Sequence, residues 1–316
     1  MRKSFLLAAA ALLAAPVAVV ACSSTSSDLG AGDDSTQTGG DASSGGDSAV
    51  GTGDTGTTPT PDSGGDLDAG VDTGIPSCAG LTYCDDFEAY LDADVDGGVE
   101  NNKMLGVWKI SIGGKAKMKV DTVKPFSGLR SLHITTPAND TTESNGTLHQ
   151  AAASGGLVTG NDVFGRAMVY YSNVGGNGLP QGHSWVFQSQ GTSTKEAANV
   201  SMNVANSGGN YFLNYHSATN PEQSVSGGTP AAGKWLCMQW EYNGSGTTPA
   251  DEGKIWIDGT VVVDAKAQTP NWDFATPWSN FDFGFTHYQT IANSMDVYLD
   301  DFALDSKMIP CPPPKP

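Results

Sequence analysis

The stretch VYLDDFAL at residues 297–304 decides the fold class. Its apolar and polar residues alternate as in a β-strand, in which successive side chains point to opposite faces. The alternation predicts that Tyr298, Asp300, Phe302 and Leu304 share one face. A second Asp-Asp-Phe sequence stands at residues 85–87. The two copies predict a first and a last strand that pair side by side, an arrangement that recurs in β-sandwiches.

The sequence from 77 to 316 predicts one all-β domain. Short runs rich in β-branched and aromatic residues recur between Gly, Asn, Pro and Ser, and Asp258-Gly259 is typical of a hairpin turn. We predict strands at 82–89, 106–112, 115–121, 129–136, 147–152, 163–171, 183–190, 198–205, 210–216, 234–243, 253–258, 260–264, 281–287 and 296–304.

Four motifs carry a family resemblance. They are CDDFE at 84–88, Gly-x-Trp at 106–108, SGLRSLHI at 127–134 and the closing VYLDDFAL. Together they resemble concanavalin-A-like jelly-roll domains, a group that includes carbohydrate-binding modules, polysaccharide lyases and the cellulose-induced Cip-type core domain. The resemblance covers about residues 80–305 and implies a jelly-roll β-sandwich, a fold that hosts many activities.

The resemblance also implies a structural calcium ion. In these modules, acidic groups at the first and last strands often hold calcium, and the matching positions are Asp86, Glu88 and Asp301. Carboxylate oxygens are the hard ligands that Ca²⁺ prefers. The alternative is that these carboxylates face solvent or cap turns.

Residues 1–21 predict a secretory signal, because Arg2 and Lys3 precede an apolar run from 5 to 20. The run ends directly before Cys22, as in a bacterial lipoprotein, although an ordinary signal peptide with a chance Cys is the alternative. Acyl chains on Cys22 would be the protein's contact with a membrane. By analogy with other lipoproteins, Ser23 favours the outer membrane, so we expect a lipid-anchored protein at the cell surface.

Residues 22–76 predict a disordered tether. The segment is rich in Gly, Ser, Thr, Asp and Pro, and it holds ten Asp but no aromatic, Lys or Arg residue. Such a composition cannot bury enough apolar surface to offset the entropy of ordering. A calcium-binding repeat is the alternative, but Asp and Gly recur without a fixed period.

The charge makes nucleic acid an unexpected partner. The formal charge is −18, and removing Arg2 and Lys3 with the signal leaves −20. Binding to phosphates needs a basic surface, which such a balance does not supply. Anionic glycans are disfavoured as a bulk effect, although a local cationic site could bind them. We expect a monomer.

The four cysteines that remain beside Cys22 predict two disulfides, because the count is even in an exported chain. Three connectivities are possible. We prefer Cys78–Cys84, which closes a small N-terminal loop, and Cys237–Cys311, which would hold the C-terminal tail on the sheet. A zinc site is the alternative, although the chain contains no Cys-x2-Cys spacing.

Alternation within the strands predicts a polar groove on one face of a sheet. Amides and hydroxyls that match sugar hydroxyls, beside aromatic rings, are the groups that a glycan site needs. His183 has the parity of the apolar Trp185 and is assigned to the groove as a strand-end residue. A solvated outer face is the alternative. The residues expected on this surface are Arg166, His183, Gln188, Asn203, Asn214, His216 and Gln239.

Three functions follow from this groove. The first is a surface lipoprotein that binds polysaccharide, with Asn203, Asn214, His216 and Gln239 as ligand-binding residues. The second is a polysaccharide lyase, which must neutralise a uronate, remove the C5 proton and protonate the leaving oxygen. The third is a non-catalytic envelope or adhesion protein without a sugar site. In a lyase, Arg166, Gln188 or Asn203 would neutralise the uronate, and His183 or His216 would be the base. Tyr170 or Tyr215 would act as acid or base, and we prefer the set Arg166, His183, Gln188 and Tyr215.

Overall fold

The computed structural model describes residues 78, 80–90, 101–138, 143–151, 162–172, 183–193, 197–207, 209–219, 223–244, 251–268, 272–289 and 294–313. All of them belong to the compact unit Leu67–Pro316. The predicted signal peptide, the lipidation site Cys22 and the tether at 22–76 lie outside the described residues. Within the described part, no helix is both long enough and apolar enough to cross a membrane.

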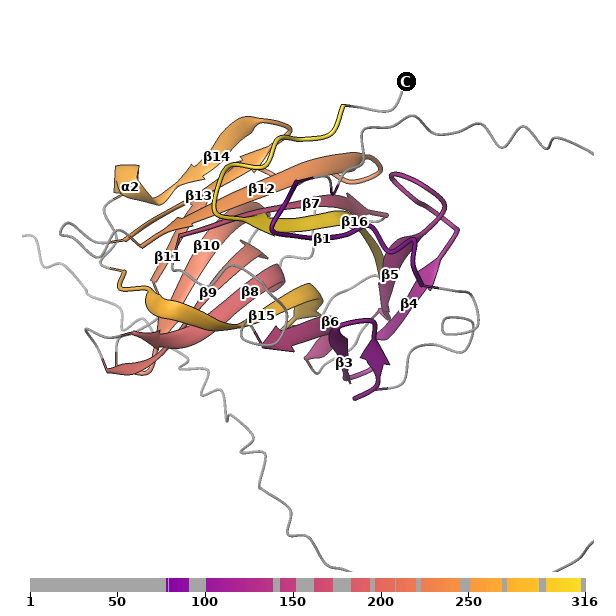
Figure 1. The fold of residues 1–316 in the computed structure, drawn as a ribbon, viewed down its shortest axis with the longest axis horizontal. Helices are drawn as coiled ribbons and strands as arrows, with labels where there is room; N and C mark the ends of the chain where they lie inside the picture. Colours follow the sequence, from indigo (N-terminus) through magenta and orange to yellow (C-terminus); the bar gives the residue numbers. More distant parts are fainter. Residues whose placement is uncertain are drawn as a thin grey trace, which may run out of the picture. The chain divides into compact units, whose positions relative to one another are not determined.

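The described residues form two antiparallel sheets of eight strands each, packed face to face (Figure 1). The first sheet contains β14 (Thr260–Asp264), β13 (Glu252–Ile257), β12 (Trp235–Asn243), β7 (Val163–Tyr171), β16 (Met295–Asp305), β5 (Ser131–Thr136) and β4 (Lys117–Asp121) in this order, with β1 (Tyr83–Asp85) beside β16. The second sheet has the order β11 (Gln223–Gly227), β10 (Asn210–Ser217), β9 (Ala198–Ser207), β8 (Ser184–Ser193), β15 (Ala275–His287), β6 (Ser144–Ala151), β3 (Trp108–Gly113) and β2 (Met104–Leu105). The predicted all-β sandwich is confirmed.

The core lies between the two sheets and is rich in aromatic rings. Phe302 of the first sheet stacks on Phe283 of the second, with ring centroids 4.1 Å apart. Phe187 and Trp240 meet across the same interface at 4.6 Å. Each of these side chains is fully buried. Their outward-facing strand neighbours remain available for other roles, because side chains alternate between the two faces of a strand.

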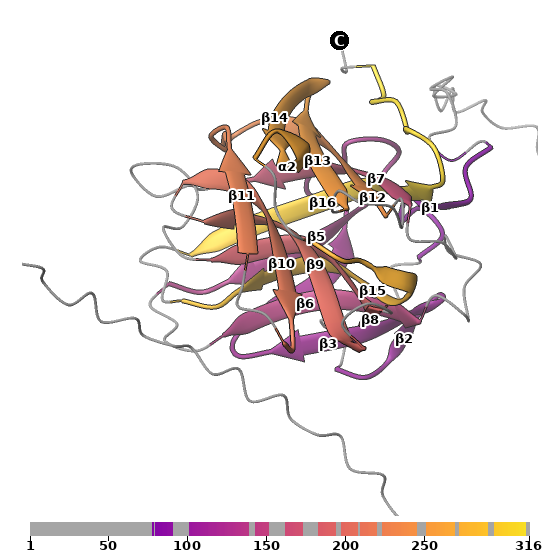
Figure 2. The same ribbon diagram turned by 90° about the vertical axis from the view of Figure 1, so that its left-hand side faces the viewer.

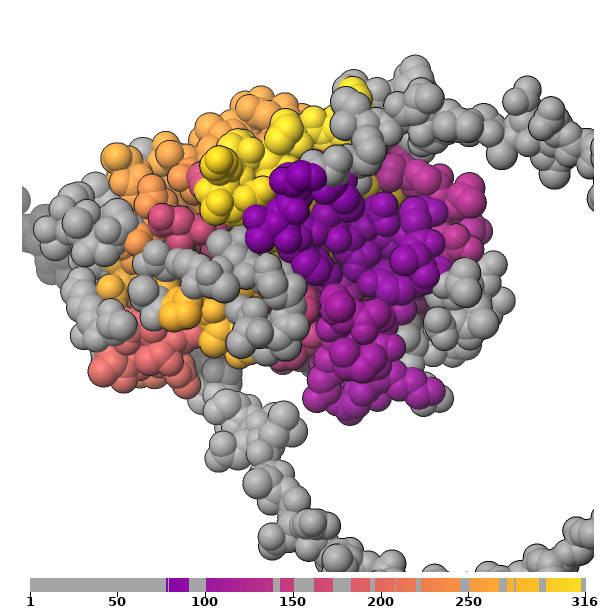
Figure 3. Space-filling model, viewed as in Figure 1, coloured from indigo at the N-terminus to yellow at the C-terminus, as the bar shows by residue number. Residues whose placement is uncertain are grey.

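The first and last strands pair, as the two Asp-Asp-Phe copies predict. In β1, Tyr83 lies opposite Leu304 and Asp85 lies opposite Phe302. Figure 3 shows the described N-terminal residues in indigo against the yellow C-terminal segment. The two ends of the domain are therefore held together by backbone hydrogen bonds in the first sheet.

A β-bulge in β16 overturns the predicted alternation of that strand. The register with β7 shifts between Asp300 and Ala303, and Asp301 has a φ of 47°. The extra residue reverses the face of every later side chain. Phe302 and Leu304 therefore join the core, whereas Tyr298 and Asp300 lie on the opposite face. The prediction that these four residues share one face is wrong for this reason.

The two preferred disulfides, Cys78–Cys84 and Cys237–Cys311, are both present in the structure. The second bridge joins β12 to the C-terminal segment that follows β16. In addition, Arg166 Nη1 donates to the Pro310 carbonyl at 3.1 Å and Gln239 Nε2 donates to the Ile309 carbonyl at 2.6 Å. The segment therefore lies against the outer face of the first sheet, held by one covalent and two polar contacts.

The two bridges should differ in their contribution to stability. Their sequence separations are 74 residues for Cys237–Cys311 and 6 for Cys78–Cys84. Chain-entropy reasoning then gives about 4 kcal/mol for the long loop and about 2 kcal/mol for the short one. Replacing each pair by Ala and measuring the free energy of unfolding in denaturant tests this. A larger loss for the Cys78–Cys84 pair would contradict it.

Candidate functional site

A row of polar side chains crosses the outer face of the second sheet. Its members stand directly opposite one another on neighbouring strands. Figure 2 shows β10, β9 and β8 side by side in this sheet. The row, called the polar row below, consists of Asn214 on β10, Asn203 on β9, Gln188 on β8, Asp282 on β15 and His149 on β6.

The polar row faces away from the core because its strand neighbours fill the core. Met202 and Val204 flank Asn203, and Phe281 and Phe283 flank Asp282; all four are fully buried in the core. Several row members are nevertheless well shielded: Asn214 is 0%, Asn203 1% and Asp282 9% exposed. Polar groups so shielded are favourable only when they are hydrogen-bonded. Asn214, Asn203 and Asp282 are thus more shielded than the side chains of an ordinary solvated face, whereas Gln188 and His149 are half-buried.

Hydrogen bonds connect the amides in the middle of the row. Gln188 Nε2 donates to Asn203 Oδ1 at 2.7 Å, and Gln190 Nε2 donates to Gln188 Oε1. Gln188 lies directly opposite both Asn203 and Asp282. These contacts restrict the amide rotamers, so the donors and acceptors are held in place before a ligand arrives.

Two histidines flank the β10 end of the row. Asn214 Nδ2 lies 2.7 Å from His216 Nε2 and 3.4 Å from His183 Nε2. With the Asn214 amide nitrogen as donor, both imidazole nitrogens act as acceptors, as in neutral imidazole. Asn214 Oδ1 is buried and has no hydrogen-bond partner in the described part of the chain. This oxygen is an acceptor that a ligand hydroxyl could satisfy.

An aromatic cluster adjoins the two histidines. His183 packs against the rings of Phe212 at 4.7 Å and Tyr288 at 5.4 Å, and Trp185 Nε1 donates to Tyr288 Oη at 2.8 Å. Trp185 lies on this outer face because the register shifts between Trp185 and Phe187, and Val186 and Phe187 both belong to the core. Simple alternation along the strand would have placed Trp185 and Phe187 on the same face.

A histidine–carboxylate pair closes the β6 end of the row. His149 Nδ1 donates to Asp282 Oδ1 at 2.7 Å. This hydrogen bond, together with the charge of Asp282, raises the pKa of His149 above its ordinary value. Neither residue was predicted as a site residue. The sequence indicates only that Asp282 points outward, because it stands between two core phenylalanines. Its pairing with His149 depends on the register of β15 with β6.

The structure brings five of the seven predicted groove residues to one face: His183, Gln188, Asn203, Asn214 and His216. Arg166 and Gln239 are corrections. They stand opposite each other on β7 and β12 of the first sheet. Both are buried under the C-terminal segment, where their N–H groups bond to its carbonyls.

Tyr215 is also a correction. Its side chain is fully buried in the core, and Tyr215 Oη donates to the Asp273 carbonyl at 3.0 Å. It has the parity of Leu213, on the face of β10 opposite to Asn214 and His216. The predicted catalytic set of Arg166, His183, Gln188 and Tyr215 is therefore not assembled in one place.

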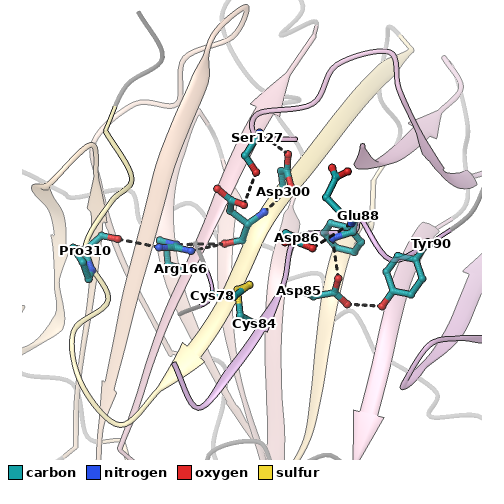
Figure 4. The surroundings of a disulfide bond; sticks show 12 residues. Cys78, Cys84, Asp85, Asp86, Glu88, Tyr90, Ser127, Arg166, Asp300 and Pro310 are labelled. Carbon is teal, nitrogen blue, oxygen red and sulfur yellow. Dashed lines mark hydrogen bonds between the residues drawn. A yellow bond between two sulfur atoms is a disulfide. The ribbon is translucent and has the colours of Figure 1, made fainter. Parts of the chain in front are cut away.

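Two of the three acidic residues proposed as calcium ligands, Asp86 and Glu88, follow the first strand (Figure 4), and the third, Asp301, lies in β16. Glu88 Oε1 accepts the backbone N–H groups of Leu129 and Arg130, each at 2.7 Å. Asp86 Oδ1 accepts the N–H of Glu88 at 3.2 Å. These two carboxylates therefore hold turns together, which was the alternative to metal binding.

Asp301 offers one observation in favour of a cation. Its Oδ1 accepts a hydrogen bond from Ser127 Oγ at 2.9 Å, but its Oδ2 is buried and has no hydrogen-bond partner in the described part of the chain. A cation would satisfy that oxygen. However, no group of three or more His, Cys, Asp or Glu side chains that could hold a metal occurs among the described residues. Calcium binding at Asp86, Glu88 and Asp301 therefore stays a prediction.

Comparison with known proteins gives distant structural similarity. No family model and no curated protein matches the chain. Among solved structures, the chain is similar to the cellulose-induced protein Cip1, with a TM-score of 0.47, 15% identity, and coverage of 72% of this chain and 99% of that one. It is also similar to the endo-β-1,4-glucuronan lyase of the fungus Trichoderma reesei, with a TM-score of 0.46, 14% identity and coverage of 66% and 94%. The binding domain of botulinum neurotoxin DC in complex with SialylT gives a TM-score of 0.41, 10% identity and coverage of 64% and 44%.

The calcium prediction can be tested by chelation. If calcium binds the native state through Asp301, thorough removal by a chelator should lower the melting temperature, because a ligand that binds only the folded chain stabilises it by mass action. Asp301→Asn is the matched control, since Asn tolerates a positive φ and removes the charge. Its melting temperature should not respond to chelation. An unchanged melting curve of the metal-free wild-type chain would remove the site.

Proposed function

We propose that the outer face of the second sheet binds a polysaccharide along the polar row. The continuous row of polar side chains, in register across five strands and shielded at Asn214, Asn203 and Asp282, is the observation that supports this most strongly. Contact with water alone does not require amides that are aligned and nearly buried. A polar row that is shielded on the face opposite the core is the arrangement expected of a binding surface.

The chemistry of the row suits sugar hydroxyls. A carboxamide offers both donors and acceptors, and a hydroxyl group can act as either. Asn214 Oδ1 is one acceptor in need of a donor. At the same end of the row, Tyr288 is 41% exposed, and its hydroxyl accepts a hydrogen bond from Trp185 Nε1. An exposed ring held in a fixed position can stack on the face of a sugar.

Binding is favoured over β-elimination by the position of the predicted catalytic residues. Arg166, the guanidinium expected to neutralise a uronate, is buried in the first sheet, and Tyr215 lies in the core. His149, oriented by Asp282, can accept a proton, but a base alone does not supply the other two parts of the elimination. We therefore assign the His149–Asp282 pair to ligand binding.

The location of the protein follows in part from its cysteines. Two disulfides are typical of a chain that has left the reducing cytoplasm. We propose that a lipid on Cys22 anchors the chain to the membrane. The anchor and the outer-membrane position stay predictions from the sequence.

Gln188→Ala should weaken glycan binding by about 1–3 kcal/mol, because a ligand hydroxyl and Asn203 both lose a hydrogen-bond partner in a shielded site. Gln188 is a better test than Asn203, since it is only half-buried and its truncation should affect folding less. A glycan array should first identify an oligosaccharide, whose affinity is then measured by calorimetry. Asn243→Ala, a half-buried amide at the end of β12 in the first sheet, is the control.

Equal affinities of the wild-type chain and Gln188→Ala, with both melting normally, would mean that the polar row is not the contact surface. The absence of any ligand on a broad array would instead favour the hypothesis of an envelope protein without a sugar site. Loss of binding in Asn243→Ala alone would place the contact on the first sheet.

A further inference from the structure

Resting on the proposed binding function, we propose that the polar row selects a neutral, hydroxyl-rich glycan over a uronic acid polymer. The row is built from three carboxamides, one carboxylate and one imidazole that is already paired with that carboxylate. The chemistry of each part disfavours a ligand that carries a carboxylate at every sugar.

The carboxylate of the row stands in its interior. Asp282 is 9% exposed and lies directly between Gln188 and His149 in the cross-strand register. A uronate placed on Gln188 would therefore approach a like charge in a shielded site, where the repulsion is poorly screened. A sugar hydroxyl at the same place can donate to Asp282 and accept from the Gln188 amide.

Four side chains that could compensate a buried uronate are engaged in other contacts: His149, His183, His216 and Arg166. His149 donates its Nδ1–H to Asp282, so its positive charge, when present, is balanced within the pair. His183 and His216 meet the Asn214 amide nitrogen through Nε2, as neutral acceptors. Arg166 donates to the carbonyls of Asp301 and Pro310 in the other sheet.

The strand sequences give the same charge balance. Over the eight strands of the second sheet, Lys109 on β3 is the one Lys or Arg residue. It stands opposite His149, beyond the end of the row, and its side chain is exposed. Charge removed from water is costly unless a partner charge and hydrogen bonds replace the water. The row supplies hydrogen bonds from its amides but no positive charge that could pair with a uronate.

The direction of the ligand follows from the register. The five row residues stand on five adjacent strands spaced about 4.8 Å apart, so the row extends for about 19 Å across the strands. A glycan chain lying along it meets an amide at three successive strands and the Asp282–His149 pair at the next two. Each uronate of an acidic polymer would therefore be placed against an amide or against Asp282.

The test compares three pairs of oligosaccharides that share a backbone and differ at C6: β-1,4-glucan with β-1,4-glucuronan, β-1,4-mannan with β-1,4-mannuronan, and α-1,4-linked galactan with α-1,4-galacturonan. Affinities of the full chain are measured by calorimetry at constant ionic strength and equal ligand length. We expect the neutral member of at least one pair to bind about tenfold or more tightly than its uronate, since one uncompensated charge contact of a few ångströms has this size.

Tighter binding of the uronate in the pair that binds would overturn this inference and leave the proposed function in place. If no member of any pair binds and a broad array of neutral glycans also gives no ligand, both the inference and the proposed function fail. The two failures are thereby distinguished.

Asp282→Asn isolates the cause. It keeps a hydrogen-bonding group of the same shape and removes the charge, so the neutral-to-uronate affinity ratio should fall severalfold. Asp305→Asn, which removes one charge from β16 of the first sheet, is the matched control and should leave the ratio unchanged. An Asp282→Asn ratio equal to that of the wild type would overturn the assigned role of Asp282.

If Asp282→Asn does not fold, His149→Gln provides the second test. Glutamine keeps a donor toward Asp282 but cannot carry a positive charge, which leaves the carboxylate unbalanced. The ratio should then rise above that of the wild-type chain. A fall in the ratio would contradict the proposed selection.

Discussion

The bulge at Asp300–Asp301 is the local constraint on which the first sheet depends. Asp301 adopts a left-handed backbone conformation, and its carbonyl accepts hydrogen bonds from Arg166 Nε and Nη2, each at 3.3 Å. Asp300 Oδ2 accepts the N–H groups of Phe126 and Ser127 at 2.8 and 3.1 Å. Burial, and secondarily the charge of Asp301, raises the pKa of Asp300. The bulge thus joins β16 to β7 and to the loop between β4 and β5. It also directs the Phe302 side chain into the core.

The two outer faces differ in how their buried polar groups are placed, and we propose a structural role for the first and a binding role for the second. On the first sheet, N–H groups of the buried Arg166 and Gln239 donate to backbone carbonyls of the C-terminal segment. On the second sheet, the shielded amides bond to one another, and Asn214 Oδ1 is left without a partner in the described part of the chain. The first sheet also holds acceptors without a partner among the described residues, Gln239 Oε1 and Asp301 Oδ2, so one unsatisfied oxygen does not distinguish the two faces. The distinguishing feature is that the polar side chains of the second sheet stand opposite one another on five neighbouring strands. The binding proposal depends on this difference.

The sequence predicted what depends on local alternation. The strands at 163–171 and 260–264, the hairpin at Asp258-Gly259 and the pairing of the first and last strands are all present. The short strands β2 and β11 were missed, since a run of two residues is too short to show alternation and Gln223–Gly227 contains a single apolar residue. The predicted alternation of side chains failed after the bulges at Asp300–Asp301 and Trp185–Phe187, because one inserted residue inverts the face of every following side chain.

Alternation along a strand also predicts that Arg166 and Gln239 point outward, but it does not say from which sheet. These two residues were therefore grouped with the wrong face. The pairing of His149 with Asp282 required the cross-strand register, which no single strand contains.

In the proposed binding mode, a glycan contacts the amides of the second sheet. The most direct measurement is the response of side-chain amide resonances of the ¹⁵N-labelled chain during titration with a neutral oligosaccharide that binds it. We predict that the chemical shifts of the Gln188, Asn203 and Asn214 side-chain amides change together and give one dissociation constant. The Gln239 side-chain amide of the first sheet should show no change. Movement of the Gln239 signal with no change at the polar row would contradict the account.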